Sequence, residues 1–210
     1  MSNIAMQGGA TGTGTVTLLA PSTSTNRTLT LPDSTGTVLT TGSTAVVTPA
    51  MLTQPLTSGT AVASTSGTSI DFTGLPSWVK RITVLFNGVS TNGTSGFLIQ
   101  LGTSGGVQIT SYDSLGNRFD TATGQGGLSS TAGFVIARST AADSLLGAMQ
   151  VCSMSSTDWA ENHAGKLSAS NAVCGGGAMT LTGTLDRVRV TTVNGTDTFD
   201  AGLVNILYEG

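Results

Sequence analysis

The sequence has few charges and few aromatic residues. Charged residues make up 9% of the 210 residues and aromatic residues 5%, whereas an average soluble domain has about 25% charged residues. Such a surface must be solvated mainly by Ser, Thr and Asn, which suit strands and turns better than helices. A net charge of -3 without any run of Lys or Arg gives no basic footprint for nucleic acid, so we expect no nucleic-acid partner.

Long apolar runs are also missing. No segment approaches the ~18 uninterrupted apolar residues of a membrane span, so we expect no membrane insertion. The N-terminal MSNIAMQGG lacks the basic and apolar regions of a signal peptide, which predicts folding in a cytosol. There Cys152 and Cys174 are expected to be reduced and buried as small apolar side chains, although their pairing stays open. One pair of thiols at this spacing is no metal site, and we expect no cofactor.

Aromatic side chains are absent from the N-terminal third. The first aromatic residue is Phe72, and residues 1–70 carry only Arg27 and Asp33 as charges. The apolar residues of this region recur in short β-compatible pieces that are too thin to fold alone. We therefore predict an extended Thr/Gly-rich arm over residues 1–45, with short strands at 14–19, 27–32 and 36–40, which needs copies of itself or a host surface for order.

A short helical segment is predicted after the arm. In VVTPAMLTQPL, Thr48 followed by Pro49 is a helix N-cap with proline at the first helical position, and Pro55 ends the turn. One or two helical turns and a linker are expected over 46–60. The remaining residues, 61–210, would form a C-terminal domain.

The C-terminal domain has the periodicity of β-strands. In KRITVLFNGV, Ile82, Val84 and Phe86 fall on one face and the intervening residues on the other. Asn-Gly pairs and many glycines supply turns. The fold class predicted is all-β, a jelly-roll-like antiparallel β-sandwich. Further strands are expected at 69–73, 97–102, 107–112, 133–138, 146–154, 157–163, 166–173, 178–184, 186–193 and 201–208.

Some of these strands are apolar on both faces. In GLVNILY at 202–208, Leu203 and Leu207 oppose Val204 and Ile206. A monomeric sandwich needs only one dry face on each sheet. We therefore expect the second face to meet another subunit.

Two segments of this domain resemble parts of known proteins. SIDFTGLPSWVKRITVLFNGVSTNGTSGFLIQLG at 69–102 and FDAGLVNILYEG at 199–210 resemble a β-sandwich head found in virion proteins of tailed bacteriophages, in tail fibres and in capsid-bound spikes. TVTLLAPSTSTNRTLTLPDSTGTVLTTG at 15–42 resembles the Thr-rich repeat that precedes such heads. The resemblance implies a non-enzymatic homotrimer with a jelly-roll-like knob, fixed by its N-terminal arm to a capsid or tail shell protein. It also implies assembly in the host bacterial cytoplasm and a final place on the virion surface.

The arm is short for a tail fibre, which usually places a long rod between anchor and head. About sixty residues precede the predicted knob, so a capsid decoration, cement or head-fibre protein is favoured slightly. The arm would act by burying small apolar side chains between chains or against the shell. These candidates for attachment or trimer contact are Val16, Leu18, Leu29, Leu31, Val38 and Leu39.

The segment TDWAENHAGK is the one most similar to an enzyme site, because it holds Asp158, Glu161 and the only histidine, His163. On a strand, Trp159, Glu161 and His163 share a face while Asp158 points away, so no three-residue relay forms locally. We expect a surface strand or trimer contact here and no catalytic residue.

Two other functions stay open. A receptor-binding tail fibre would contact a host surface or glycan, and the Gly-rich stretch 111–127, predicted as a loop, offers Tyr112, Arg118 and Asp120. A stand-alone carbohydrate-binding module could stack Trp78 on a sugar, although a corner that closes the sandwich edge is preferred for this residue. A polysaccharide-cleaving enzyme is disfavoured, since the eleven acidic residues show no local clustering.

Overall fold

The computed structural model describes residues 22, 24–26, 54–121 and 124–210. The chain divides into two compact units, Met1–Val46 and Val47–Gly210. Among the described residues every regular element is a β-strand. The strands are β1 (Thr57–Ser58), β2 (Val62–Ala63), β3 (Ile70–Thr73), β4 (Arg81–Thr91), β5 (Phe97–Thr103), β6 (Gly106–Val107), β7 (Tyr112–Asp120), β8 (Gly124–Ser130), β9 (Phe134–Ile136), β10 (Leu145–Ser153), β11 (Asp158–Lys166), β12 (Asn171–Thr180), β13 (Arg187–Thr192) and β14 (Phe199–Glu209).

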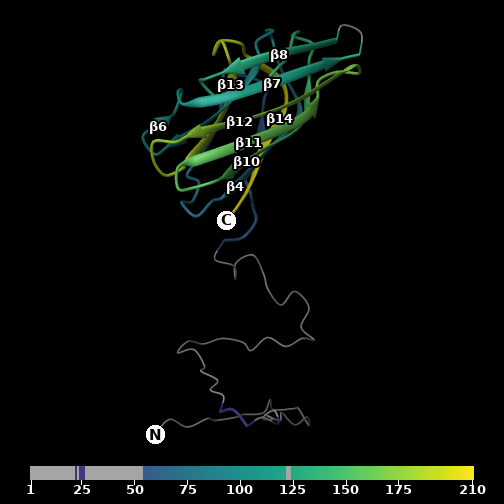
Figure 1. Ribbon diagram of the computed structural model, residues 1–210. Helices are drawn as coiled ribbons and strands as arrows, with labels where there is room; N and C mark the ends of the chain where they lie inside the picture. Colours follow the sequence, from purple (N-terminus) through teal and green to yellow (C-terminus); the bar gives the residue numbers. More distant parts are fainter. Residues whose placement is uncertain (1–21, 23, 27–53, 122–123) are drawn as a thin grey trace, which may run out of the picture. The chain divides into compact units, whose positions relative to one another are not determined.

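The strands form two sheets, and all of their pairings are antiparallel. The nine-stranded sheet has the order β1-β14-β4-β10-β11-β12-β7-β8, with β2 also paired to β14. The five-stranded sheet has the order β3-β13-β5-β6, with β9 paired to β5. In Figure 1 the nine-stranded sheet faces the viewer and the other sheet lies behind it. The predicted all-β antiparallel sandwich is therefore confirmed.

Alternating side chains from both sheets fill the space between them. On β4, Ile82, Val84 and Phe86 are buried while Arg81 and Asn87 are exposed. Each large apolar side chain removed from water stabilises the fold by about 1.5–3 kcal/mol. The same core includes the stacked rings of Phe97 and Phe199, whose centroids lie 6.4 Å apart.

Most of the predicted strands are present, but several boundaries were wrong. The strand expected at 107–112 does not exist as one piece, because β6 ends at Val107 and β7 begins at Tyr112. The strands expected at 157–163, 166–173 and 178–184 are in fact two, since β11 runs to Lys166 and β12 runs from Asn171 to Thr180. Glycines in the middle of β12 suggested turns, although they lie within a paired strand.

The Gly-rich stretch 111–127, predicted as a loop, is mainly strand. It contains all of β7 and the start of β8, which pair from Ser114 with Ser130 to Asp120 with Gly124. The small residues of β8 have a low propensity for strand structure. However, β7 lies between β8 and β12 and therefore has a hydrogen-bonded neighbour on each side. Tertiary pairing thus decides the conformation of this stretch.

The sandwich begins inside the range predicted as a linker. β1 pairs Thr57 with Tyr208 and Ser58 with Leu207, near the end of β14. The chain therefore enters the sandwich at the same end at which it finishes. The helical turn predicted after Thr48 and the short strands of the arm lie outside the described residues. No helix among the residues that are described has the length and apolar character needed to cross a membrane.

Candidate functional site

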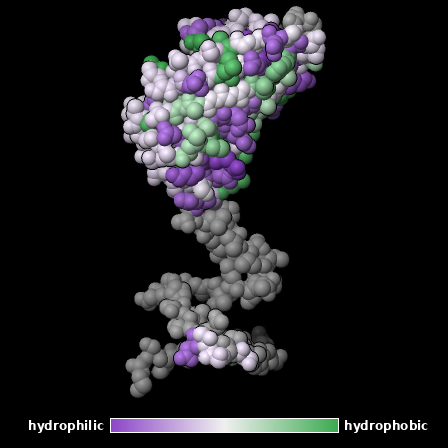
Figure 2. Space-filling model, in the orientation of Figure 1, coloured by the Kyte–Doolittle hydropathy of each residue, from purple (hydrophilic) through white to green (hydrophobic). Residues whose placement is uncertain are grey.

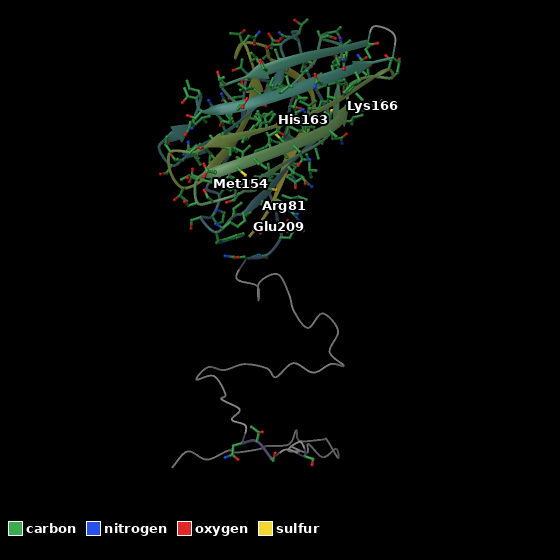
Figure 3. All side chains as sticks on the ribbon, in the orientation of Figure 1. Arg81, Met154, His163, Lys166 and Glu209 are labelled. Carbon is green, nitrogen blue, oxygen red and sulfur yellow. The ribbon has the colours of Figure 1, made fainter. Side chains whose placement is uncertain are left out.

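A hollow of about 340 Å³ lies where the end of β7 meets the turn between β11 and β12. We name it the distal hollow, because Figure 3 places Lys166 at the end of the sandwich opposite Arg81, Glu209 and the C-terminus. Residues around it include Phe119, Asp120, Lys166, Ser168, Ser170 and Asn171.

Two of the predicted host-contact residues, Arg118 and Asp120, pair with each other near the end of β7, and Asp120 lines this hollow. Arg118 Nη1 donates to Asp120 Oδ2 at 3.0 Å, and the two side chains are only 16% and 14% exposed. With the Asn171 amide oriented so that its nitrogen faces the carboxylate, it donates to the same Asp120 oxygen at 2.8 Å. The Arg118–Asp120 pair therefore fixes the end of β7 and offers little free charge.

The exposed groups at the hollow are Phe119 and Lys166. Phe119 is 45% exposed and lies opposite Ala172, whose small side chain leaves the ring uncovered. An aromatic face beside an ammonium group and serine hydroxyls can bind a polar, hydroxylated ligand such as a sugar. Sequence reasoning missed both residues, although the alternation in YDSLGNRFD would have placed Phe119 on an outward face.

Tyr112, the third predicted host-contact residue, is not on the surface. Its side chain belongs to the core, with 3% of the residue exposed. The Leu101 backbone N–H donates to its hydroxyl at 2.7 Å, and its ring meets that of Phe134 edge-on at 5.0 Å. The prediction failed because the stretch was assigned to a loop, whereas β7 turns Tyr112 inward.

The burial of Tyr112 predicts a loss of stability in alkali. Burial raises the pKa of this phenol well above its usual value near 10, more than the Leu101 N–H lowers it. Above pH 10 the unfolded chain releases a proton that the folded chain keeps, so folding is opposed by about 1.4 kcal/mol per pH unit. Urea unfolding at pH 9 to 12 should therefore show a shallower decline for Tyr112→Phe than for the natural protein. Equal slopes would contradict this assignment.

Glu161 and His163 lie in the core, and the expectation of a surface strand was wrong. Trp159, Glu161 and His163 do share one face of β11, but that face points into the sandwich. Glu161 Oε2 lies 3.2 Å from His163 Nδ1, and the two side chains are 0% and 1% exposed. Figure 3 labels His163 in the middle of the molecule. The other carboxylate oxygen and His163 Nε2 have no hydrogen-bond partner among the described residues.

This pair does not form a larger reactive cluster. Among the described residues no group of three or more His, Cys, Asp or Glu side chains could hold a metal ion. Asp158 points to the outer face, where its carboxylate accepts hydrogen bonds from Thr180 and Ser155. These hydrogen bonds, that from Thr180 first, lower the pKa of Asp158.

The cysteines and Trp78 have structural positions. Cys152 and Cys174 are free thiols on the outer face of the nine-stranded sheet, and because Cys174 is exposed the expected burial was wrong. Trp78 is half-buried in the turn before β4, where its ring packs against Tyr208 at 6.0 Å. This agrees with the preferred interpretation of Trp78 as a corner of the sandwich.

The six predicted attachment residues of the arm, Val16, Leu18, Leu29, Leu31, Val38 and Leu39, lie outside the described residues. Comparison with protein-family models, with curated proteins and with solved structures finds no match to the chain.

Proposed function

We propose that this protein is a non-enzymatic structural component of a tailed-phage virion, a homotrimeric surface knob held by its N-terminal arm. The observation that carries the proposal is the resemblance of residues 69–102 and 199–210 to the heads of phage virion proteins. In the fold, these two segments supply β3, β4 and β5 and the whole of β14. β14 is hydrogen-bonded to β4 along most of its length, and β3 and β5 lie on either side of β13 in the other sheet, so the resembling segments contribute strands to both sheets.

A jelly-roll-like description of the knob has support from its connections. The chain passes from β3 in the five-stranded sheet to β4 in the nine-stranded sheet and back to β5. It crosses again from β13 to β14. Repeated crossing between two antiparallel sheets is typical of jelly-roll sandwiches.

The arrangement of the chain ends suits an anchored knob. β1 pairs with the last residues of β14, so residues that precede the sandwich join it at the end opposite the distal hollow. In the proposal, residues 1–45 bind the shell protein through small apolar side chains, each worth about 1–2 kcal/mol when buried. Three arms on one trimer would multiply weak individual binding through avidity. The shortness of the arm favours a capsid decoration, cement or head-fibre protein.

Deletion of residues 1–45 tests the attachment. The shortened protein is expected to be soluble and folded, because the second unit, Val47–Gly210, contains every strand of the sandwich. It should be absent from sedimented particles, whereas the full-length chain should sediment with them. Incorporation of the shortened chain at the full-length level would refute the attachment role of the arm.

A receptor-binding tail fibre is the second candidate. The distal hollow favours it, because the exposed Phe119 ring and Lys166 lie at the end farthest from the chain entry. Such a site would bind a host surface glycan. Specific binding of the purified protein to host cells, competed by surface polysaccharide, would support this function over capsid decoration.

A further inference from the structure

The outer face of the nine-stranded sheet is broad and has few charges. Strand register sets its outward side chains in three adjacent rows that cross six strands from β7 to β14. Among the residues of these rows, all of which the structure describes, only Lys166 is charged, and it lies at the distal margin. The rows are Phe119-Ala172-Lys166-Leu146-Asn87-Leu203, Asn117-Cys174-Ala164-Ala148-Leu85-Asn205 and Leu115-Gly176-Asn162-Gln150-Thr83-Leu207. The next row of the same face is Asp113-Ala178-Ala160-Cys152-Arg81-Glu209, which adds three charges on β7, β4 and β14.

One half of this face projects and the other half is flat. On β10, β4 and β14, Leu85 lies diagonally next to Leu146, Leu203 and Leu207, within reach of long side chains. We name these four residues the leucine patch, and two of them, Leu146 and Leu203, are 42% and 44% exposed.

On β11 and β12 the outward side chains are small. We name this strip the flat strip, and it consists of Ala160, Asn162, Ala164, Cys174, Gly176 and Ala178. Figure 2, drawn from the same side as Figure 1, shows mostly white and pale green surface over this part of the molecule, interrupted by purple patches. The flat strip thus has the relief to receive projecting side chains.

The chemistry of the face fits a subunit contact. Six strands about 4.8 Å apart give a width of roughly 30 Å, and three rows give a length of about 15 Å before side-chain relief is added. The plan area is therefore roughly 450 Å² before side-chain relief, compared with about 800 Å² per partner in a specific interface, and a subunit that meets two neighbours divides this area between them. Depletion of charge is the compositional mark of an interface centre, and an exposed thiol such as Cys174 is uncommon on a surface that stays in water.

We infer that the outer face of the nine-stranded sheet is the contact between copies of this chain, with the leucine patch of one subunit seated on the flat strip of the next. The inference rests on the trimer of the proposed function and identifies its surface. The patch and the strip are different parts of one face, so the contact is heterologous. Heterologous contacts close into a ring when the rotation between copies permits it. Each subunit then uses its patch against one neighbour and its strip against the other.

The ring leaves both ends of the knob free. Phe119 and Lys166 lie at the distal margin of the face, so a ligand can still reach the distal hollow. The Arg81–Glu209 ion pair lies at the opposite margin, near β1 and the chain entry. In a cyclic assembly the β1 strands of all copies therefore lie at the same end.

Charge placed in the centre of the face tests the inference. Ala164→Arg in the flat strip and Leu203→Arg in the leucine patch are made in the full-length chain, and mass is measured by light scattering. The natural protein is expected near 63 kDa, three times the 21.0 kDa chain, and each variant near 21 kDa with an unchanged far-ultraviolet circular dichroism spectrum. The matched control is Ile109→Arg, which changes a 63% exposed residue beside the five-stranded sheet and should leave the trimer intact.

Trimers of either variant, or a monomeric natural protein, would overturn the inference. Thiol labelling decides the question even if a variant fails to fold. In the natural protein, Cys174 should react with a bulky maleimide at least about tenfold more slowly than in the unfolded chain, because the neighbouring subunit covers it. Labelling at the rate of the unfolded chain would contradict the proposed contact.

These outcomes are separate from those that test the proposed function. A trimer held by this face but absent from purified particles would refute the virion function and leave the contact standing. Particles that carry a trimer unaffected by both Arg substitutions would support the virion function and refute the proposed contact.

Discussion

Replacement of Glu161 by leucine is expected to lower the free energy of unfolding by about 1–3 kcal/mol. The carboxylate and the His163 ring contact each other at 3.2 Å with side chains that are 0% and 1% exposed. Without Glu161, neither nitrogen of the imidazole has a partner among the described residues, because Nε2 already lacks one. A buried polar group without a partner retains its full desolvation cost.

The double variant Glu161→Leu, His163→Leu distinguishes the energy of the Glu161–His163 contact from the energy of packing two side chains at these positions. Two apolar side chains of similar volume should recover most of the stability lost in the single variant. Urea unfolding of the single variants and the double variant forms a cycle whose coupling energy belongs to the pair. Thr131→Ala, at an exposed position, should change stability by less than about 0.5 kcal/mol. A loss below about 1 kcal/mol in Glu161→Leu would mean that the buried His163 ring does not depend on its contact with Glu161.

The second large effect is expected from a single methyl group on β12. An added Cβ at Gly175 would lie 2.7 Å from His163 Nε2 and 2.5 Å from the Leu115 carbonyl oxygen. The imidazole could move, but the carbonyl belongs to β7, which is paired on both sides. Gly175→Ala should therefore cost about 3 kcal/mol or more, or prevent folding.

Gly176→Ala is the matched control for this effect. A Cβ at Gly176 points to the outer face, and its nearest neighbour is the Glu161 carbonyl oxygen at 3.4 Å. The change should alter the free energy of unfolding by less than about 1 kcal/mol. Similar losses for the two alanine variants in urea unfolding would contradict the position of His163 over Gly175.

The sequence could predict the elements that alternate clearly. β4, β5, β10, β13 and β14 combine apolar residues at every second position with flanking turn residues, and their existence followed from that pattern. The all-β class followed from the same signal. Boundaries were predicted less well, since the glycines of β12 indicated turns, although one of them, Gly175, gives room to His163 within a paired strand.

The candidate sites were harder to predict, because they depend on which way a strand faces. The shared face of Glu161 and His163 follows from period two, but polar side chains suggested solvent, and only the fold shows that the face points inward. Because 111–127 was predicted as a loop, neither the burial of Tyr112 nor the outward position of Phe119 was predicted. The two faces of the strand at 202–208 differ in burial, since Val204 and Ile206 are buried while Leu203 is 44% exposed. That another subunit covers Leu203 stays a prediction.

Immunogold labelling of purified particles, with an antibody against the knob, tests the central claim most directly. A surface knob anchored by its arm should give gold on intact particles, over the capsid for a decoration, cement or head-fibre protein. Gold at the tail tip would instead support the receptor-binding tail fibre. Unlabelled particles, with the chain found only in the soluble fraction of the lysate, would contradict a virion role altogether.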